Sequence, residues 1–181
     1  LMRRAELPVA RSQGFHPKPR VSYLSALPLG FSSDDEAMEL ILEEDWPSDV
    51  LLQKLNDASV EGLEFLQAVP LEEGAPKQQA FAFSYDMTVP RELAEGLDQK
   101  IADFMSATTV EVVKANGKSV DARPPVKELA LDGATLRLVL SAQSGPEAGV
   151  REILACLGLD AALFRTIFPN RNRTYIVDEL R

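Results

Sequence analysis

The chain has 181 residues, of which 45% are hydrophobic, so its length and composition allow a packed core in one larger domain or in two small ones. Its formal net charge of −9 disfavours nucleic-acid binding by the protein as a whole, although a local basic patch can still bind phosphate. A single cysteine excludes an internal disulfide and favours a reducing cytoplasm, and one histidine with one cysteine cannot form the usual zinc site. No apolar run approaches the roughly 18 residues that a membrane-spanning helix needs.

The first 70 residues contain a series of short patterns. Residues 1–7 are typical of a helix end that stops before a proline. Residues 21–27, 37–44 and 62–69 have the composition of strands, and residues 48–57 predict a short helix that begins at a serine. We expect a strand and the start of the first helix to precede residue 1. The order is then β-α-β-β-α-β, a ferredoxin-like module lacking its N-terminal strand and part of its first helix.

Residues 71–79, LEEGAPKQQ, place glycine, proline and polar residues between two apolar segments, and we interpret them as a linker. Beyond the linker, Asp132–Gly133 between two apolar runs predicts a hairpin, and Ser144 with Glu147 has capping-box spacing. The predicted order is again β-α-β-β-α-β. Its elements are strands at 80–87, 125–131 and 135–142, helices at 88–105 and 144–158, a further strand at 108–115, an extended stretch at 118–125, and a last strand or bent pair within 163–177.

These elements predict an α+β protein of two tandem ferredoxin-like modules. The first module spans residues 1–70, the linker spans residues 71–79, and the second module spans residues 80–181. One large mixed sheet would contain the same elements, so both arrangements stay open at this stage.

The charge of the chain is unevenly distributed. Residues 1–20 hold five cationic side chains and one carboxylate, a net charge of +4, so the other 161 residues carry −13. Within this segment, residues 11–20 read RSQGFHPKPR and combine the only histidine with two prolines, a glycine and an aromatic residue. Pro17 and Pro19 stiffen the backbone, and Gly14 permits a turn with positive φ. We expect a stiff, extended loop that leads into the strand at Val21.

The loop has two interpretations. In extended backbone, His16, Lys18 and Arg20 point the same way and suit an anionic ligand, while Phe15 stacks on a base or anchors the loop. In the other interpretation, the loop is a rigid connector whose charges are solvated and whose phenylalanine belongs to the core. The residues selected for ligand or RNA binding are Arg4, Arg11, Ser12, Gln13, Gly14, Phe15, His16, Lys18 and Arg20.

Other polar segments are weaker candidates. Asp121 and Arg123 fall on one side of an extended, proline-containing segment, and Arg165, Arg171 and Arg173 alternate with aromatic residues as a second anion surface. The carboxylates of the SSDDE run at 32–36 lack the staggered spacing of a calcium loop, so we expect a solvated loop. No nucleophile or carboxylate stands at a recognisable spacing from His16. The sequence therefore predicts no catalytic residue, no metal site and no cofactor.

Residues 3–40 carry a specific pattern: RRA-x-LP-x-A-x-SQGFHP-x-P, then a strand, then LPLG followed by Ser33 and Glu36. This pattern resembles the bacterial radical SAM-linked family, also called DUF2344. The resemblance returns more weakly at 120–124 and 165–166. Members of that family usually begin with another strand and a helix carrying a Ser-His-Leu-Asp motif, which precedes the pattern seen in this chain.

The resemblance implies a partner protein. Family members are encoded beside, or fused to, a radical SAM protein, often near genes for ribonuclease and ribosomal proteins, which points to RNA or ribosome modification. We therefore expect a non-catalytic accessory to a radical SAM enzyme that binds RNA or another anionic substrate through the loop. The alternatives are a protein–protein adaptor that docks onto the enzyme without touching nucleic acid, and an RNA-modifying enzyme in its own right.

Overall fold

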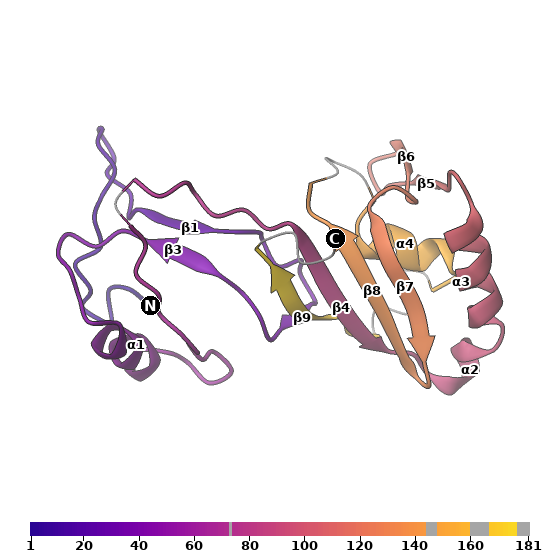
Figure 1. Cartoon of the computed structure of the whole chain (residues 1–181), viewed down its shortest axis with the longest axis horizontal. Helices are drawn as coiled ribbons and strands as arrows, with labels where there is room; N and C mark the ends of the chain where they lie inside the picture. Colours follow the sequence, from indigo (N-terminus) through magenta and orange to yellow (C-terminus); the bar gives the residue numbers. More distant parts are fainter. Residues whose placement is uncertain (73, 144–147, 160–166, 177–181) are drawn as a thin grey trace. The chain divides into compact units, whose positions relative to one another are not determined.

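The computed structural model describes residues 1–72, 74–143, 148–159 and 167–176. It shows a mixed α+β protein, which confirms the predicted class (Figure 1). The chain forms two compact units: residues 1–23 with 38–77, and residues 24–37 with 78–181. No helix in the described part of the chain is long and apolar enough to cross a membrane.

The second unit is built on a five-stranded sheet with the order β2-β9-β4-β8-β7. Every neighbouring pair is antiparallel except β2 and β9, which are parallel. The central strand β4 is buried along most of its length, which explains its aromatic and apolar composition. The strands are β2 (Ser32–Ser33), β4 (Ala82–Thr88), β7 (Val126–Asp132), β8 (Thr135–Ser141) and β9 (Asn170–Tyr175).

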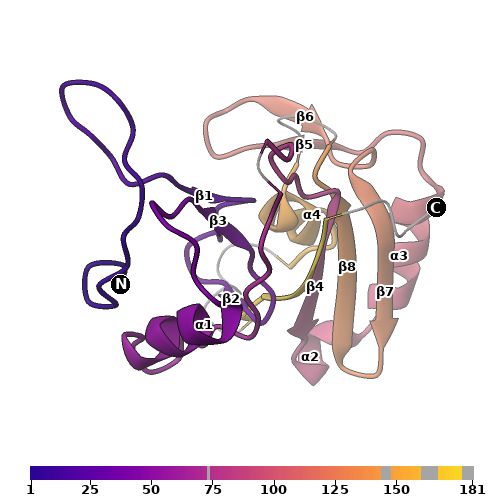
Figure 2. The same cartoon turned by 60° about the vertical axis from the view of Figure 1, so that its left-hand side comes forward.

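Two longer helices cover one face of this sheet, as both views show (Figures 1 and 2). Their buried residues recur at helical spacing and join the strands in one core cluster; in α3 these are Leu97, Ile101 and Phe104. The predicted helix at 88–105 is divided because Gly96, with φ of 72°, ends the first part. The helices are α2 (Arg91–Ala94), α3 (Leu97–Ser106) and α4 (Val150–Cys156).

The elements of this unit follow the predicted order in β4, α3, β7, β8, α4 and β9. The predicted hairpin is present, with Gly133 and Ala134 between the paired ends of β7 and β8. Gly133 has φ of 59°, the positive value that such a two-residue turn requires. The predicted strand at 108–115 does not join the five-stranded sheet. Its central residues form β5 (Glu111–Val113), which pairs with β6 (Ser119–Asp121) in a separate two-stranded sheet of the described residues. The predicted cap at Ser144 and Glu147 lies outside the described residues.

The first unit contains one helix and a two-stranded sheet among its described residues. Strand β1 (Val21–Tyr23) pairs with β3 (Met38–Leu40) in antiparallel fashion, and α1 spans Ser48–Asp57. The small core combines the buried residues Ala5, Leu7 and Leu55 with partly buried apolar neighbours.

Two predicted elements of the first unit are wrong. Residues 1–5 form hydrogen-bonded turns instead of a helix end, and Glu6 stops them by adopting a left-handed φ of 52°. Residues 62–69 form no strand, and the Asn56 side chain takes both backbone hydrogen bonds of Phe65 within this segment. The Asn56 amide donates to the carbonyl of Phe65 at 2.9 Å and accepts from its N–H at 2.7 Å. The tandem of ferredoxin-like modules stays a prediction.

Candidate functional site

Residues 10–20 form a hairpin, which we call the basic hairpin (Figure 2). The N–H of Ser12 donates to the carbonyl of Lys18 over 2.8 Å, and the N–H of Arg20 donates to the carbonyl of Ala10 over 2.8 Å. The Ser12 hydroxyl also accepts from the N–H of Lys18 at 3.0 Å. The N–H of Ala10 donates in turn to a carbonyl just after β3. The hairpin therefore extends the β1–β3 sheet, and backbone hydrogen bonds between its two arms close its base.

The tip of the basic hairpin departs from strand geometry at residues 13–16. Gly14 has φ of 128°, a conformation that side-chain-bearing residues rarely adopt. Phe15 is 102% exposed, so the expectation of the connector interpretation that this ring belongs to the core is wrong. Gln13 and His16 are also exposed. The tip thus presents an aromatic ring directly to solvent.

The cations of the hairpin are divided between its two faces. Arg11 and Pro19 are directly opposite each other in an antiparallel bridge, so alternation places Lys18 and Arg20 together on the other face. The bend at 13–16 interrupts the alternation before His16. The predicted row of three side chains is therefore reduced to Lys18 and Arg20, with His16 at the tip.

Among the residues that the structure describes, no ion pair joins a carboxylate to the hairpin. The sequence has no aspartate or glutamate between Glu6 and Asp34. Within the described ranges, both ion pairs lie in the second unit. The guanidinium of Arg11 donates to the carbonyl of Pro17 at 3.4 Å, which leaves its charge uncompensated. Arg4 is exposed in the turns before the hairpin, and no described contact joins its side chain to Arg11, His16, Lys18 or Arg20. The hairpin is consequently an exposed cationic surface on an acidic protein.

Asp121 and Arg123 do not form the surface pair that the sequence suggests. The Asp121 carboxylate accepts from the backbone N–H groups of Val110 and Arg123 at 2.8 and 3.0 Å. The Arg123 guanidinium donates to the carbonyls of Met105 and Val126. Both side chains therefore fasten the β5–β6 hairpin to its surroundings through hydrogen bonds with backbone groups.

The hydrogen bonds to Asp121 predict a pH effect on stability. Bonds from the Val110 and Arg123 N–H groups hold the pKa of the Asp121 carboxyl below its ordinary value. The stabilisation is complete above the unfolded value of about 3.9 and is lost as pH falls through the lower folded value. We expect wild type to lose more stability than Asp121→Asn between about pH 5 and pH 2. Urea unfolding at both pH values measures this difference, and equal losses in the two proteins would contradict it.

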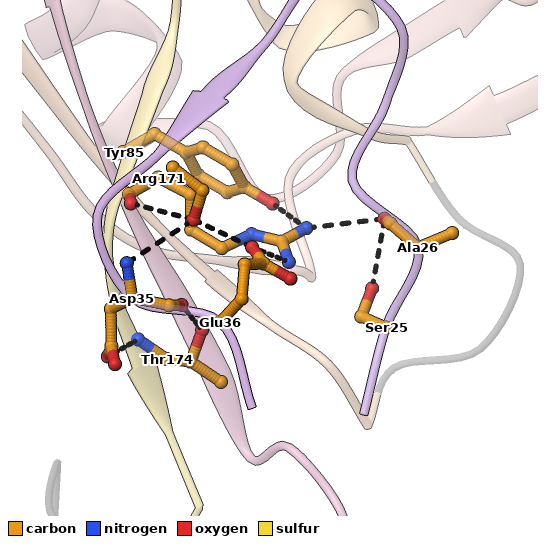
Figure 3. A network of polar contacts seen from close by, with 8 residues as sticks. Ser25, Ala26, Asp35, Glu36, Tyr85, Arg171 and Thr174 are labelled. Atoms are coloured by element: carbon orange, nitrogen blue, oxygen red, sulfur yellow. Dashed lines mark hydrogen bonds and ion pairs between the residues drawn. The ribbon is translucent and has the colours of Figure 1, made fainter. Parts of the chain in front are cut away.

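Arg171 is the third sequence candidate whose side chain is used inside the protein (Figure 3). It is 2% exposed, and its guanidinium carbon lies 4.2 Å from the centre of the Phe83 ring. One guanidinium nitrogen donates to Glu36 at 2.8 Å, and another donates to the Tyr85 hydroxyl at 3.3 Å. Burial raises the pKa of the Tyr85 phenol, and the nearby Arg171 charge opposes that rise. Arg171 is thus part of the core of the second unit, where a surface ligand cannot reach it.

We expected the SSDDE run at 32–36 to be a solvated loop, and this prediction is wrong. Its two serines form β2, and the three carboxylates that follow bind β9 or its side chains. Asp35 accepts from the N–H of Thr174 at 2.6 Å, and the Ser33 hydroxyl donates to Glu36 at 2.7 Å. The partners lie about 135 residues away along the chain. Only the LPLG-x-x-Ser-x-x-Glu pattern marks these residues in the sequence, and it does not reveal their partners.

The remaining candidates are distributed as follows. Arg173 is exposed on β9, and its guanidinium carbon lies 4.6 Å from the centre of the Tyr175 ring. Arg165 lies outside the described residues. Among the residues that the structure describes, no three histidine, cysteine, aspartate or glutamate side chains are grouped to hold a metal ion. The basic hairpin is therefore the exposed candidate site that the structure supports best.

Together, the fold and the hairpin define a mixed α+β protein that carries a cationic hairpin with an aromatic tip. The chain belongs to the family described as "uncharacterized protein conserved in bacteria" (DUF2344), which it matches over residues 1–151. No curated protein and no solved structure matches it. The match covers the whole basic hairpin and the SSDDE run, but it ends before β9 and Arg171.

Proposed function

We propose that this protein is an accessory to a radical SAM enzyme and binds RNA through the basic hairpin. The observation that carries the proposal is an exposed group of cations on a protein of net charge −9, with no ion pair to a carboxylate in the described part of the chain. Uncompensated, exposed cations on an acidic body favour an anionic ligand, and lysine and arginine side chains commonly contact the phosphates of nucleic acids. The radical SAM enzyme enters the proposal through the family resemblance, and a cytoplasmic location enters it through the single cysteine.

The phosphate contacts make RNA binding depend on salt. If Arg11, Lys18 and Arg20 each neutralise one phosphate of a single strand, the logarithmic slope is about −2. Raising the salt from about 50 mM to about 200 mM should then weaken binding about 20-fold. Fluorescence anisotropy with the full chain and a labelled RNA measures the slope. Absence of binding at low salt, or binding that does not change with salt, would refute the proposal.

A protein–protein adaptor is the second candidate function, and exposed apolar residues favour it. Residues 63–71 form no strand and include the exposed Leu63, Leu66, Val69 and Leu71. An adaptor would use such residues, or the hairpin, to dock onto the enzyme. Capture of the radical SAM protein before and after nuclease treatment separates the two functions. Capture that survives nuclease, together with no RNA binding, would favour the adaptor.

We also retain the tandem ferredoxin-like architecture as a proposal. The sheet order β9-β4-β8-β7 with α3 and α4 supports it for the second unit. In the first unit, β1, β3 and α1 supply part of such a module.

A further inference from the structure

We infer that the basic hairpin binds unpaired nucleotides, with one base stacked on Phe15, and that it discriminates against duplex RNA. This inference rests on the proposed function and adds the structural class of the RNA. Its evidence is the position of the aromatic ring at the hairpin tip and the placement of the cations behind it.

The first observation is that the Phe15 side chain contacts nothing in the protein. It is 102% exposed, whereas the other phenylalanines of the first 100 residues are at most partly exposed. A fully solvated phenyl ring forgoes the roughly 2 kcal/mol that burial would contribute. The exposed ring has both faces available, and aromatic faces of this kind stack on unpaired bases in single-strand binding proteins.

The second observation is that the backbone fixes the ring at the tip. The Ser12–Lys18 hydrogen bonds close the hairpin below it, and the positive φ of Gly14 sets the bend directly before it. Pro17 restricts the backbone on the other side of His16. Because the backbone of the tip is already ordered, a base that stacks on Phe15 has to order only the side chain of that residue.

The third observation is the distance along the chain between the ring and the cations. Lys18 and Arg20 share one face of the hairpin ladder, three and five residues beyond Phe15. Fully extended backbone would span about 10 and 17 Å over these separations, and the bend at the tip makes the actual distances shorter, within the reach of two or three nucleotides of a single strand. A base on Phe15 and phosphates on Lys18 and Arg20 therefore fit one short unpaired segment. In a duplex the bases are stacked inside the helix, so only the phosphates would be bound.

The test compares a labelled, unstructured RNA of about 12 nucleotides with the same strand annealed to its complement. We expect wild type to bind the single strand more tightly. Phe15→Ala should weaken single-strand binding about tenfold and leave duplex binding unchanged, while Phe15→Trp should retain the preference. Lys18→Glu/Arg20→Glu should weaken binding to both RNAs. Phe168→Ala is the matched control, because Phe168 is 63% exposed in the second unit.

The outcomes separate the two proposals. If Phe15→Ala binds the single strand as wild type does while the double charge reversal weakens binding, base stacking is refuted and the proposed function survives. If wild type binds neither RNA, both fail. If Phe15→Ala abolishes capture of the radical SAM protein but leaves RNA binding intact, Phe15 is a protein-docking residue and the inference is refuted. Because Phe15 is solvated, we expect its variants to keep the circular dichroism and unfolding curve of wild type.

Discussion

Replacing Arg171 by alanine is expected to lower the free energy of unfolding by about 3 kcal/mol. The guanidinium stacks on Phe83, and it donates to Glu36 and to Tyr85 inside the second unit. Alanine would leave a cavity and remove the donors from these groups. Breaking a fully buried ion pair typically costs about 3 to 5 kcal/mol, and we expect the lower value because the Glu36 side chain is 39% exposed. Urea unfolding followed by circular dichroism measures the difference.

The neighbouring arginine on the same strand provides the control. Arg173 is exposed on β9, and its replacement by alanine should cost less than about 1 kcal/mol. Arg171→Lys keeps the charge but loses the planar group that stacks on Phe83, so we expect an intermediate loss. Equal, small losses for Arg171→Ala and Arg173→Ala would show that the buried network contributes little to the stability of the second unit.

Reversing two charges of the basic hairpin is expected to weaken RNA binding about 100-fold in the Lys18→Glu/Arg20→Glu variant. Each substitution removes one charge-assisted phosphate contact and adds a repulsive carboxylate on the same face. The logarithmic salt slope should also fall by about 1.4, since two phosphates of a single strand are no longer neutralised. Both side chains are exposed, so the fold should be unaffected. Anisotropy titrations at several salt concentrations measure both effects.

A control with the same change in net charge is available in the second unit. Lys118 and Lys127 are exposed, and reversing both alters the net charge as much as the hairpin variant does. We expect the Lys118→Glu/Lys127→Glu variant to bind RNA within about threefold of wild type, because long-range repulsion is screened at physiological salt. Equal weakening by both pairs would mean that overall charge, and not the hairpin, governs binding.

Patterns that arise from neighbouring residues predicted the second unit well. Alternating aromatics located β4, the Asp132–Gly133 pair located the β7–β8 hairpin, and a helical stripe located α3. These elements are determined by burial of one face and by local turn chemistry, both of which leave short-range patterns. The first unit was predicted less well: residues 62–69 have an apolar composition, yet they form no strand, and at Phe65 the Asn56 side chain takes the two hydrogen bonds that a neighbouring strand would otherwise make.

In the candidate site, too, the sequence predicted some features and missed others. The unusual composition of RSQGFHPKPR identified the basic hairpin, and the exposure of Phe15 and the closed base came from the structure. Arg171 appeared in the sequence as a member of a basic surface because its partner Glu36 is 135 residues away. Long-range pairing of this kind leaves no periodic signal in a single sequence, so neither the burial of Arg171 nor the role of the SSDDE run was predictable.

Ultraviolet cross-linking of the full chain to RNA, followed by identification of the modified peptide, tests the central claim most directly. The account predicts cross-links within residues 10–20, foremost at Phe15, and their loss in the Lys18→Glu/Arg20→Glu variant. Cross-links confined to residues 78–181, or none at low salt, would contradict it.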